Sequence, residues 1–126
     1  MDSSDSLPSE FDERYSRQMR FAPLGEEGQR RLAAGRALVC GLGALGSALA
    51  GTLVRAGVGM VRVVDRDFLE LSNLQRQTLY DEEDVASGLP KAIAAERKLR
   101  AINSQVAIEA YVADVTHKNI DTLAGD

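Results

Sequence analysis

The chain has 126 residues, the size of one ordinary domain. It is 44% hydrophobic and 27% charged, which is typical of a soluble globular protein with a sizeable core. A single cysteine, Cys40, excludes an internal disulfide and a cysteine-rich zinc site, and it favours a reducing, cytoplasmic setting. The formal net charge of -4 argues against nucleic acid or an anionic membrane as a partner.

The first third of the chain is expected to hold a short polar tail and two helices. Ser9 with Asp12 three residues later is typical of a capped helix start. Gly35 is a typical helix stop. The expected segments are a disordered lead-in over 1–10, a domain over 11–126, and within it helices over 11–20 and 25–34.

After residue 36, short apolar runs alternate with helical patterns. The predicted elements are a buried strand over 37–40, a helix over 44–56, a strand over 60–64, a loop over 67–90 with short helical turns at most, a helix over 90–102 and a strand over 106–112. A short last helix is expected to run through Leu123 with Thr116 as its cap. This order predicts the α/β class, with a Rossmann-like doubly wound parallel sheet beside the N-terminal helices. About three strands are expected, so the sheet is incomplete relative to the usual five or six.

Three glycines after the first predicted strand have the spacing of a nucleotide-binding turn. Gly41, Gly43 and Gly46 form a G-x-G-x-x-G pattern that ends a strand and opens a helix. Gly41 permits the tight turn, Gly43 lets the backbone approach a phosphate or ribose, and Gly46 lets the helix pack on the strand. Free N–H groups at the helix start favour an anion, which predicts a nucleotide here. The plainer alternative is a glycine-rich turn without a ligand.

Two acidic residues follow the second predicted strand. Asp65 lies 19 residues after Gly46, where a carboxylate accepts hydrogen bonds from ribose hydroxyls. Asp67 lies in the same loop, either beside the nucleotide or as a solvated acid. Arg66 between them is a candidate to bind the 2′-phosphate of NADP, so this motif leaves the choice of cofactor open.

Several segments in chain order resemble one superfamily. They are residues 14–18 (RYSRQ), 41–46 (GLGALG), 56–59 (AGVG), 65–67 (DRD), 71–77 (LSNLQRQ) and 88–91 (GLPK). Over residues 12–113 the chain is similar to the MoeB/ThiF/HesA branch of the ubiquitin-activating superfamily. The resemblance implies a homodimeric enzyme that uses ATP and Mg²⁺ to adenylate the C-terminal carboxylate of a ubiquitin-like sulfur-carrier protein.

The same resemblance implies roles for individual side chains. The catalytic set is Arg76, Lys91 and Arg17, and the nucleotide-binding set is Gly41, Gly43, Gly46, Asp65, Asp67, Asn73, Arg76, Gln77 and Lys91. Arg76 and Lys91 would hold phosphates, and Asn73 and Gln77 would orient them by hydrogen bonds. Arg17 would reach the phosphates of the other subunit, a task that suits a planar guanidinium. Lys91 stands in the first turn of a helix, where a positive charge is mildly unfavourable, and this favours a functional role for it.

The sequence departs from the family pattern in two respects. Ala44 replaces a glycine that is common in this branch, which is a mild change inside the glycine fingerprint. Beyond the position of Asp126 the family continues with a magnesium-binding aspartate, a loop cysteine and often zinc-binding cysteine pairs. We therefore expect the N-terminal part of such a domain, inactive alone, with the Mg²⁺ ligand beyond residue 126 and Zn²⁺ only in a full-length parent.

Three further side chains receive plain structural interpretations. Cys40 ends a predicted buried strand, so we expect it to be inert and packed in the core. His117 lies in a polar stretch and is expected to be solvated or to cap a helix. Arg14 is a candidate partner for Asp12 or Glu13 in a local salt bridge.

Other functions remain compatible with the sequence. An NAD(P)-dependent oxidoreductase domain would also use the glycines and Asp65, but it has no evident need for Arg76, Lys91 and Asn73. A non-catalytic nucleotide-binding or assembly module is a second alternative. A relative that acts on tRNA through the same adenylation chemistry is a third. The leading hypothesis is the adenylyltransferase.

Overall fold

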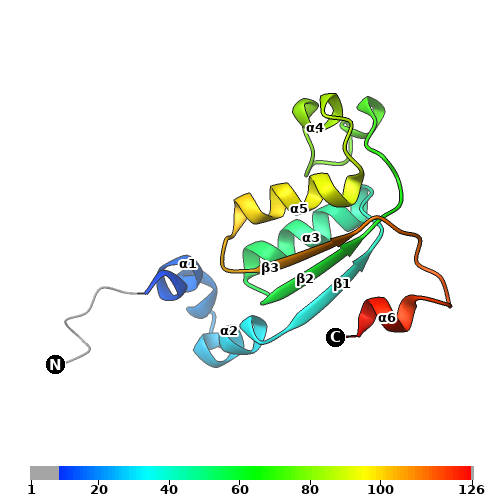
Figure 1. Ribbon diagram of the computed structural model, residues 1–126. Coiled ribbons are helices and arrows are strands. Elements are labelled where there is room, and N and C mark those ends of the chain that lie inside the picture. The colour runs from blue at the N-terminus through cyan, green and yellow to red at the C-terminus, as the bar shows by residue number, and fades with distance from the viewer. Residues whose placement is uncertain (1–8, 126) are drawn as a thin grey trace.

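A computed structural model describes residues 9–125 of the protein. Its centre is a parallel sheet in the order β1-β2-β3, formed by β1 (Arg36–Cys40), β2 (Met60–Val64) and β3 (Ala107–Tyr111). The register pairs Met60 with both Arg36 and Ala107. Because all strands are parallel, their carboxyl ends meet at one edge, toward which the arrows in Figure 1 point. The prediction of about three parallel strands is confirmed.

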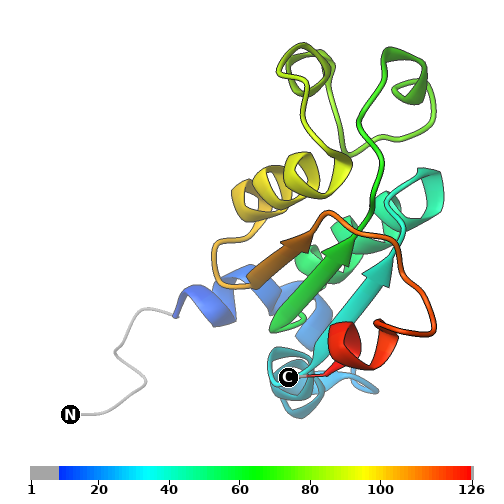
Figure 2. The same cartoon turned by 45° about the vertical axis from the view of Figure 1, so that its right-hand side comes forward.

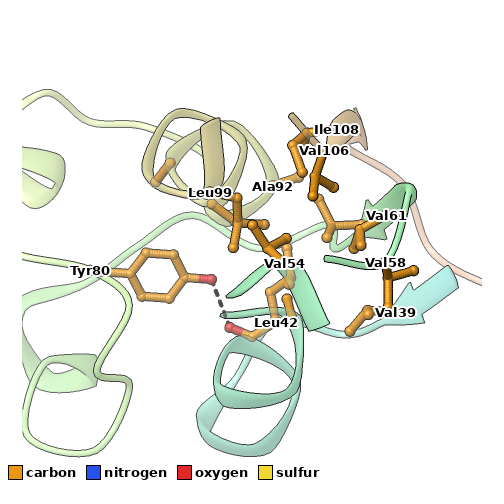
Figure 3. Packing of buried hydrophobic residues seen from close by; sticks show 14 of the residues in the cluster. Val39, Leu42, Val54, Val58, Val61, Tyr80, Ala92, Leu99, Val106 and Ile108 are labelled. Carbon is orange, nitrogen blue, oxygen red and sulfur yellow. Dashed lines mark hydrogen bonds between the residues drawn. The ribbon is translucent and has the colours of Figure 1, made fainter. Parts of the chain in front are cut away.

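Two helices cover one face of the sheet and form the core with it. They are α3 (Ala44–Ala56) and α5 (Lys91–Ile102), which lie side by side along the strands (Figure 1). Both match the sequence prediction, because α3 ends at Gly57 in the left-handed region (φ +92°) and α5 begins directly after Pro90. Figure 3 shows part of the core, which includes Val39, Leu42, Val54, Val61, Leu99 and Ile108.

The opposite face of the sheet carries much less cover. The short helix α6 (Ile120–Ala124) lies on this side in Figure 2. Arg62 of β2 is buried there, pairs with Glu109 at 3.0 Å, and donates to the backbone oxygen of Gly125 at 2.7 Å. Cys40 at the end of β1 is exposed, so the prediction of a buried core thiol is wrong. An apolar strand sequence does not reveal which face will be covered.

Two helices precede the sheet and pack near its amino end (Figure 1). These are α1 (Glu10–Met19) and α2 (Gly25–Ala33). The predicted cap is confirmed, because the Ser9 hydroxyl accepts a hydrogen bond from the Asp12 N–H at 3.1 Å. Residues 1–8 of the predicted lead-in lie outside the described residues, whereas Glu10 already belongs to α1.

The long connection between β2 and α5 lies over the carboxyl ends of the strands (Figures 1 and 2). It contains the short turn η2 (Leu71–Asn73) and helix α4 (Glu82–Ala86), which confirms the predicted loop with brief helical turns. Lys98 of α5 pairs with Asp81 and, at 3.5 Å, with Asp84, and so fastens α4 to the helix below it.

The last helix begins later than predicted. The Thr116 carbonyl accepts hydrogen bonds from the N–H groups of Asn119 and Ile120, which makes a turn, and α6 starts after Asn119. Thr116 was predicted as the cap because its hydroxyl is a good capping group, but here that hydroxyl accepts from the Lys118 N–H within the turn. Among residues 9–125, none of the helices has the length and apolarity to cross a bilayer.

Candidate functional site at the carboxyl edge of the sheet

The glycine turn joins β1 to α3 at the carboxyl edge. Gly41 has φ +90°, which disfavours any residue with a side chain. A Cβ on Gly46 would lie 1.8 Å from the Gly41 carbonyl oxygen, so the close contact of helix and strand requires glycine there. Gly43 is the N-cap of α3 and supplies no side-chain cap, which leaves N–H groups at the helix start open to a ligand.

Asp65 connects this turn to the loop after β2. Its Oδ2 accepts a hydrogen bond from the Leu42 N–H at 2.7 Å, and its Oδ1 accepts from the Asp67 N–H at 2.7 Å. A carboxylate has about four lone-pair sites, so two backbone bonds leave acceptor capacity for ribose hydroxyls. The predicted ribose-binding residue therefore also has a structural task that the sequence pattern did not reveal.

Asp67 and Arg66 line the mouth of the same site. The Arg66 guanidinium lies 3.1 Å from Asp114 and 3.5 Å from Asp67, and the Asp114 charge is the main cause that raises the pKa of Arg66. A depression is lined by both residues together with Gly41, Asp65 and Asp114. Arg66 thus offsets part of the negative charge of this pocket, and its guanidinium is engaged by two carboxylates.

The specific segment over 71–77 folds as a tight turn beside the glycines. The Asn73 side-chain oxygen accepts from the Glu70 N–H at 2.8 Å, and the Asn73 backbone oxygen accepts from the Gln77 N–H at 2.8 Å. Gln77 is buried, and its Nε2 lies 3.9 Å from the position that a Cβ on Gly43 would occupy. Its Oε1 is buried without a hydrogen-bond partner in the described chain, which marks an unmet acceptor at the glycine turn.

Arg76 and Lys91, the two predicted phosphate ligands, differ in their surroundings. Arg76 is exposed and donates to the Ser72 carbonyl at 3.3 Å, and most of its five donors have no partner within the described part of the chain. Lys91 is 7% exposed, and its side chain makes no hydrogen bond or ion pair with any residue in the part of the chain that the structure describes. Its backbone N–H donates to the Asp67 carbonyl at 2.9 Å, which brings Lys91 to the same edge. Its ammonium group therefore has no ion-pair partner among the described residues, and a phosphate would supply one.

Tyr80 is a site residue that sequence reasoning missed. Its hydroxyl donates to the Leu42 carbonyl at 2.8 Å (Figure 3). Burial, followed by the charges of Asp65 and Asp84, raises the pKa of Tyr80 well above its ordinary value, so the hydroxyl stays protonated. The available signal was an aromatic residue in a polar loop, three positions after Gln77.

Arg17 is separated from these residues. It is exposed in the last turn of α1. Two other residues of this helix hold it near the amino end of the sheet: the Tyr15 hydroxyl accepts a hydrogen bond from Asn103, and the Gln18 side chain donates one to the Ala56 carbonyl. The structure therefore does not bring Arg17 to the site of its own chain.

Arg14 pairs with Glu10 at 3.4 Å rather than with Asp12 or Glu13, because residues four apart share a helix face. His117 is exposed, as expected.

The structure thus gathers at one edge the glycines, Asp65, Asp67, Asn73, Arg76, Gln77 and Lys91. Within residues 9–125, no group of three or more His, Cys, Asp or Glu side chains is arranged to hold a metal ion. The site offers helix N–H groups, amides and cations, which suits a phosphorylated nucleotide.

Comparison with known sequences agrees with this chemistry. The chain is 58% identical over 113 residues to the sulfur carrier protein ThiS adenylyltransferase of Bacillus subtilis, covering 90% of this chain and 34% of that protein. It is 48% identical over 107 residues to a sulfur carrier protein adenylyltransferase of Thermus thermophilus, covering 85% of this chain and 39% of the relative. The chain therefore spans little more than a third of the length of these relatives.

Comparison with solved structures and protein families gives the same relationship. PaaA superimposes with a TM-score of 0.86 at 32% identity, over 100% of this chain and 42% of that one. The Escherichia coli tRNA N6-threonylcarbamoyladenosine dehydratase TcdA, solved with ATP, gives 0.83 at 27% identity, over 94% and 48%. The ThiF family matches residues 15–126. With a family match over most of its length and a relative at 58% identity, the chain belongs to the ThiF family.

Proposed function

We propose that the protein acts in ATP-dependent adenylation of the C-terminal carboxylate of a ubiquitin-like sulfur-carrier protein. The observation that carries the ATP part is Lys91, whose side chain has no ion-pair partner among the described residues and which stands at the edge that holds the glycine turn. The sulfur-carrier part rests on the names of the B. subtilis and T. thermophilus relatives. Their identities of 58% and 48% exceed the 27% to TcdA, which favours a carrier protein over a tRNA substrate.

The proposed chemistry requires little covalent participation by the protein. The carrier carboxylate attacks the α-phosphorus of ATP, a P–O bond forms, and pyrophosphate leaves. The residues of this chain bind and orient: Lys91 and Arg76 stabilise negative charge on the phosphates, and Asp65 accepts from the ribose. The unmet Gln77 Oε1 and the Asn73 amide group supply further hydrogen bonds near the glycine turn.

Several finer features belong to the same proposal. Mg²⁺ accompanies ATP as a counterion of its phosphates, and the enzyme works in the cytoplasm. The active form is a homodimer in which Arg17 of one subunit reaches the nucleotide of the other. The position of Arg17 on α1, away from the site of its own chain, supports this arrangement because a guanidinium supplied across the interface needs an exposed site.

A nicotinamide-dependent oxidoreductase is less well supported. The glycines and Asp65 are compatible with it, and Arg66 was a candidate to bind the 2′-phosphate of NADP. Arg66 is already paired with Asp114 and Asp67, so its charge is offset. Two carboxylates beside the pocket mouth would also repel an additional phosphate there.

Calorimetry with Mg·ATP, NAD and NADP tests the nucleotide assignment. We expect Mg·ATP to bind more tightly than either dinucleotide, and micromolar NADP binding without ATP binding would overturn the proposal. The adenylation step is tested by exchange of labelled pyrophosphate into ATP, in the presence of a sulfur carrier that ends in Gly-Gly. The same carrier without its two terminal glycines is the matched control, and it should give no exchange.

A further inference from the structure

One residue of the glycine turn, Leu42, is held at both of its backbone polar groups by side chains from distant segments. Its N–H donates to Asp65 Oδ2 at 2.7 Å, and its carbonyl accepts from the Tyr80 hydroxyl at 2.8 Å. The Leu42 side chain is fully buried in the core below (Figure 3). The turn is therefore held by Asp65, which follows β2, and by Tyr80, which lies in the loop before α4.

We propose that Tyr80 is a positioning residue whose hydroxyl fixes the glycine turn in the conformation that binds the nucleotide. This inference rests on the proposed function, because it assigns a role toward the same ATP site. Tyr80 itself touches the turn, and its effect on the nucleotide is transmitted through the Leu42–Gly43 peptide.

The geometry of a peptide group explains the effect. In a trans peptide the carbonyl of Leu42 and the N–H of Gly43 point in opposite directions within one plane. By holding the carbonyl, Tyr80 also sets the direction of the Gly43 N–H. That N–H makes no hydrogen bond to any residue among 9–125, so it is free to donate to a ligand.

The flanking residues make such a restraint necessary. Gly41 and Gly43 have no side chains, and an unrestrained pair of glycines samples many backbone conformations. Tyr80 is 6% exposed, so water does not compete for its hydroxyl, and its raised pKa keeps the proton that is donated. The same loop brings Gln77 against Gly43, so one segment contacts two successive residues of the turn.

The test compares Tyr80→Phe with Tyr15→Phe, which is a matched control. Tyr15 is also buried, at 3% exposure, and its hydroxyl accepts one hydrogen bond of 2.8 Å from Asn103 near the amino end of the sheet. Each variant keeps the ring and removes one buried hydroxyl, so both should lower the melting temperature by similar amounts. Only Tyr80→Phe should weaken Mg·ATP binding, by about 3- to 10-fold, the scale of one neutral hydrogen bond.

Amide hydrogen exchange distinguishes a local loosening of the glycine turn from a general loss of stability. In Tyr80→Phe without nucleotide, exchange of the Leu42 N–H should quicken by more than exchange in the central strand β2, whose amides follow the global loss of stability, and Tyr15→Phe should not show this difference. Equal ATP affinities in Tyr80→Phe and the wild type, or equal losses in both variants, would overturn the positioning role. Failure of the wild-type chain to bind ATP would instead overturn the proposed function, so the two failures are distinguishable.

Discussion

Asp65 and Leu42, 23 positions apart, are joined by a 2.7 Å hydrogen bond from the Leu42 N–H to Oδ2 of Asp65. The other carboxylate oxygen accepts from the Asp67 N–H. One side chain therefore aligns the turn after β1 with the loop after β2. The residue predicted to bind the ribose therefore has a second role, which is to hold two loops together.

Replacing Asp65 with asparagine should weaken ATP binding by about 1.5–3 kcal/mol, the scale of hydrogen bonds to a charged group. The amide nitrogen cannot accept, so one of the two backbone bonds is lost together with an acceptor for the ribose. Calorimetry with Mg·ATP measures the change. Asp114→Asn is the control, since Asp114 lines the same depression but bonds to Arg66 instead of to the glycine turn. Equal losses in both variants would contradict the role given to Asp65.

Arg76→Ala should also weaken ATP binding, by about 1.5–3 kcal/mol, because a charged donor to the phosphates is removed. Arg66→Ala removes a guanidinium of the same type from the same connection, but one that is already engaged by Asp114 and Asp67. We expect its effect to be much smaller. Titration of both variants with Mg·ATP provides the comparison, and indistinguishable dissociation constants would exclude the assignment of Arg76 as a phosphate ligand.

The chain is expected to form a homodimer. Leu45 and Leu49 on α3 are 74% and 49% exposed, and apolar side chains at this exposure favour association. Sedimentation equilibrium at low micromolar concentration should give about twice the 13.6 kDa of one chain. A single species at the mass of one chain would rule the dimer out.

A mixing experiment tests whether Arg17 acts across the dimer. Arg17→Ala and Lys91→Ala should each be defective in pyrophosphate exchange in the complete enzyme. In a mixed dimer, the intact Lys91 of one subunit and the intact Arg17 of the other form one complete site. Recovery of exchange after mixing is therefore expected, whereas no recovery despite demonstrated formation of mixed dimers would place Arg17 outside the site.

The attachment of α4 to α5 should depend on pH. The hydrogen bond from Lys98 lowers the pKa of Asp81, and the same bond raises the pKa of Lys98. A lowered carboxyl pKa stabilises the fold above the unfolded value of about 4, and this contribution is lost as pH falls through the folded pKa. The raised lysine pKa contributes below about 10.4 and is lost as pH rises through its folded value.

Lys98→Ala should therefore lower the melting temperature slightly at pH 7, and the difference from the wild type should vanish near pH 2. The effect is small because the pair is solvent-exposed and screened. Lys118→Ala is the control, since Lys118 is exposed in the turn before α6 and, among residues 9–125, hydrogen-bonds through its backbone N–H and not through its side chain. A difference that persists unchanged at acid pH would show that Lys98 stabilises by packing alone.

Local signals predicted most of the architecture. The strand over 60–64 and the helix over 44–56 were predicted with the observed boundaries because apolar runs and Gly57 mark them within the sequence itself. The glycine spacing likewise predicted the turn. Long-range contacts were not predictable in this way: the exposure of Cys40 depends on what covers the second face, and the burial of Lys91 depends on the loop above it.

The same limit applies to Tyr80 and Thr116. Tyr80 gained its role from a partner 38 positions earlier in the chain, and no spacing rule connects a loop tyrosine to a glycine turn. Thr116 and Asn119 are both residue types that cap helices well. The N–H groups of Asn119 and Ile120 donate to the Thr116 carbonyl in a turn, and the helix therefore starts after Asn119. The predicted site residues other than Arg17 converge at one edge because parallel strands align their carboxyl ends, a property of the fold class itself.

The strand β1 lies at the edge of the sheet, directly before the glycine turn. β1 pairs with β2 on one side, and within residues 9–125 no strand pairs with its other side. A strand that added there, from this polypeptide or another, would run beside Leu38 and Cys40 and end next to Gly41. Strand addition and nucleotide binding would then order the same turn, and each would strengthen the other by the same factor. Bound ATP would in that case stabilise the pairing of the added strand with β1, in addition to being a substrate.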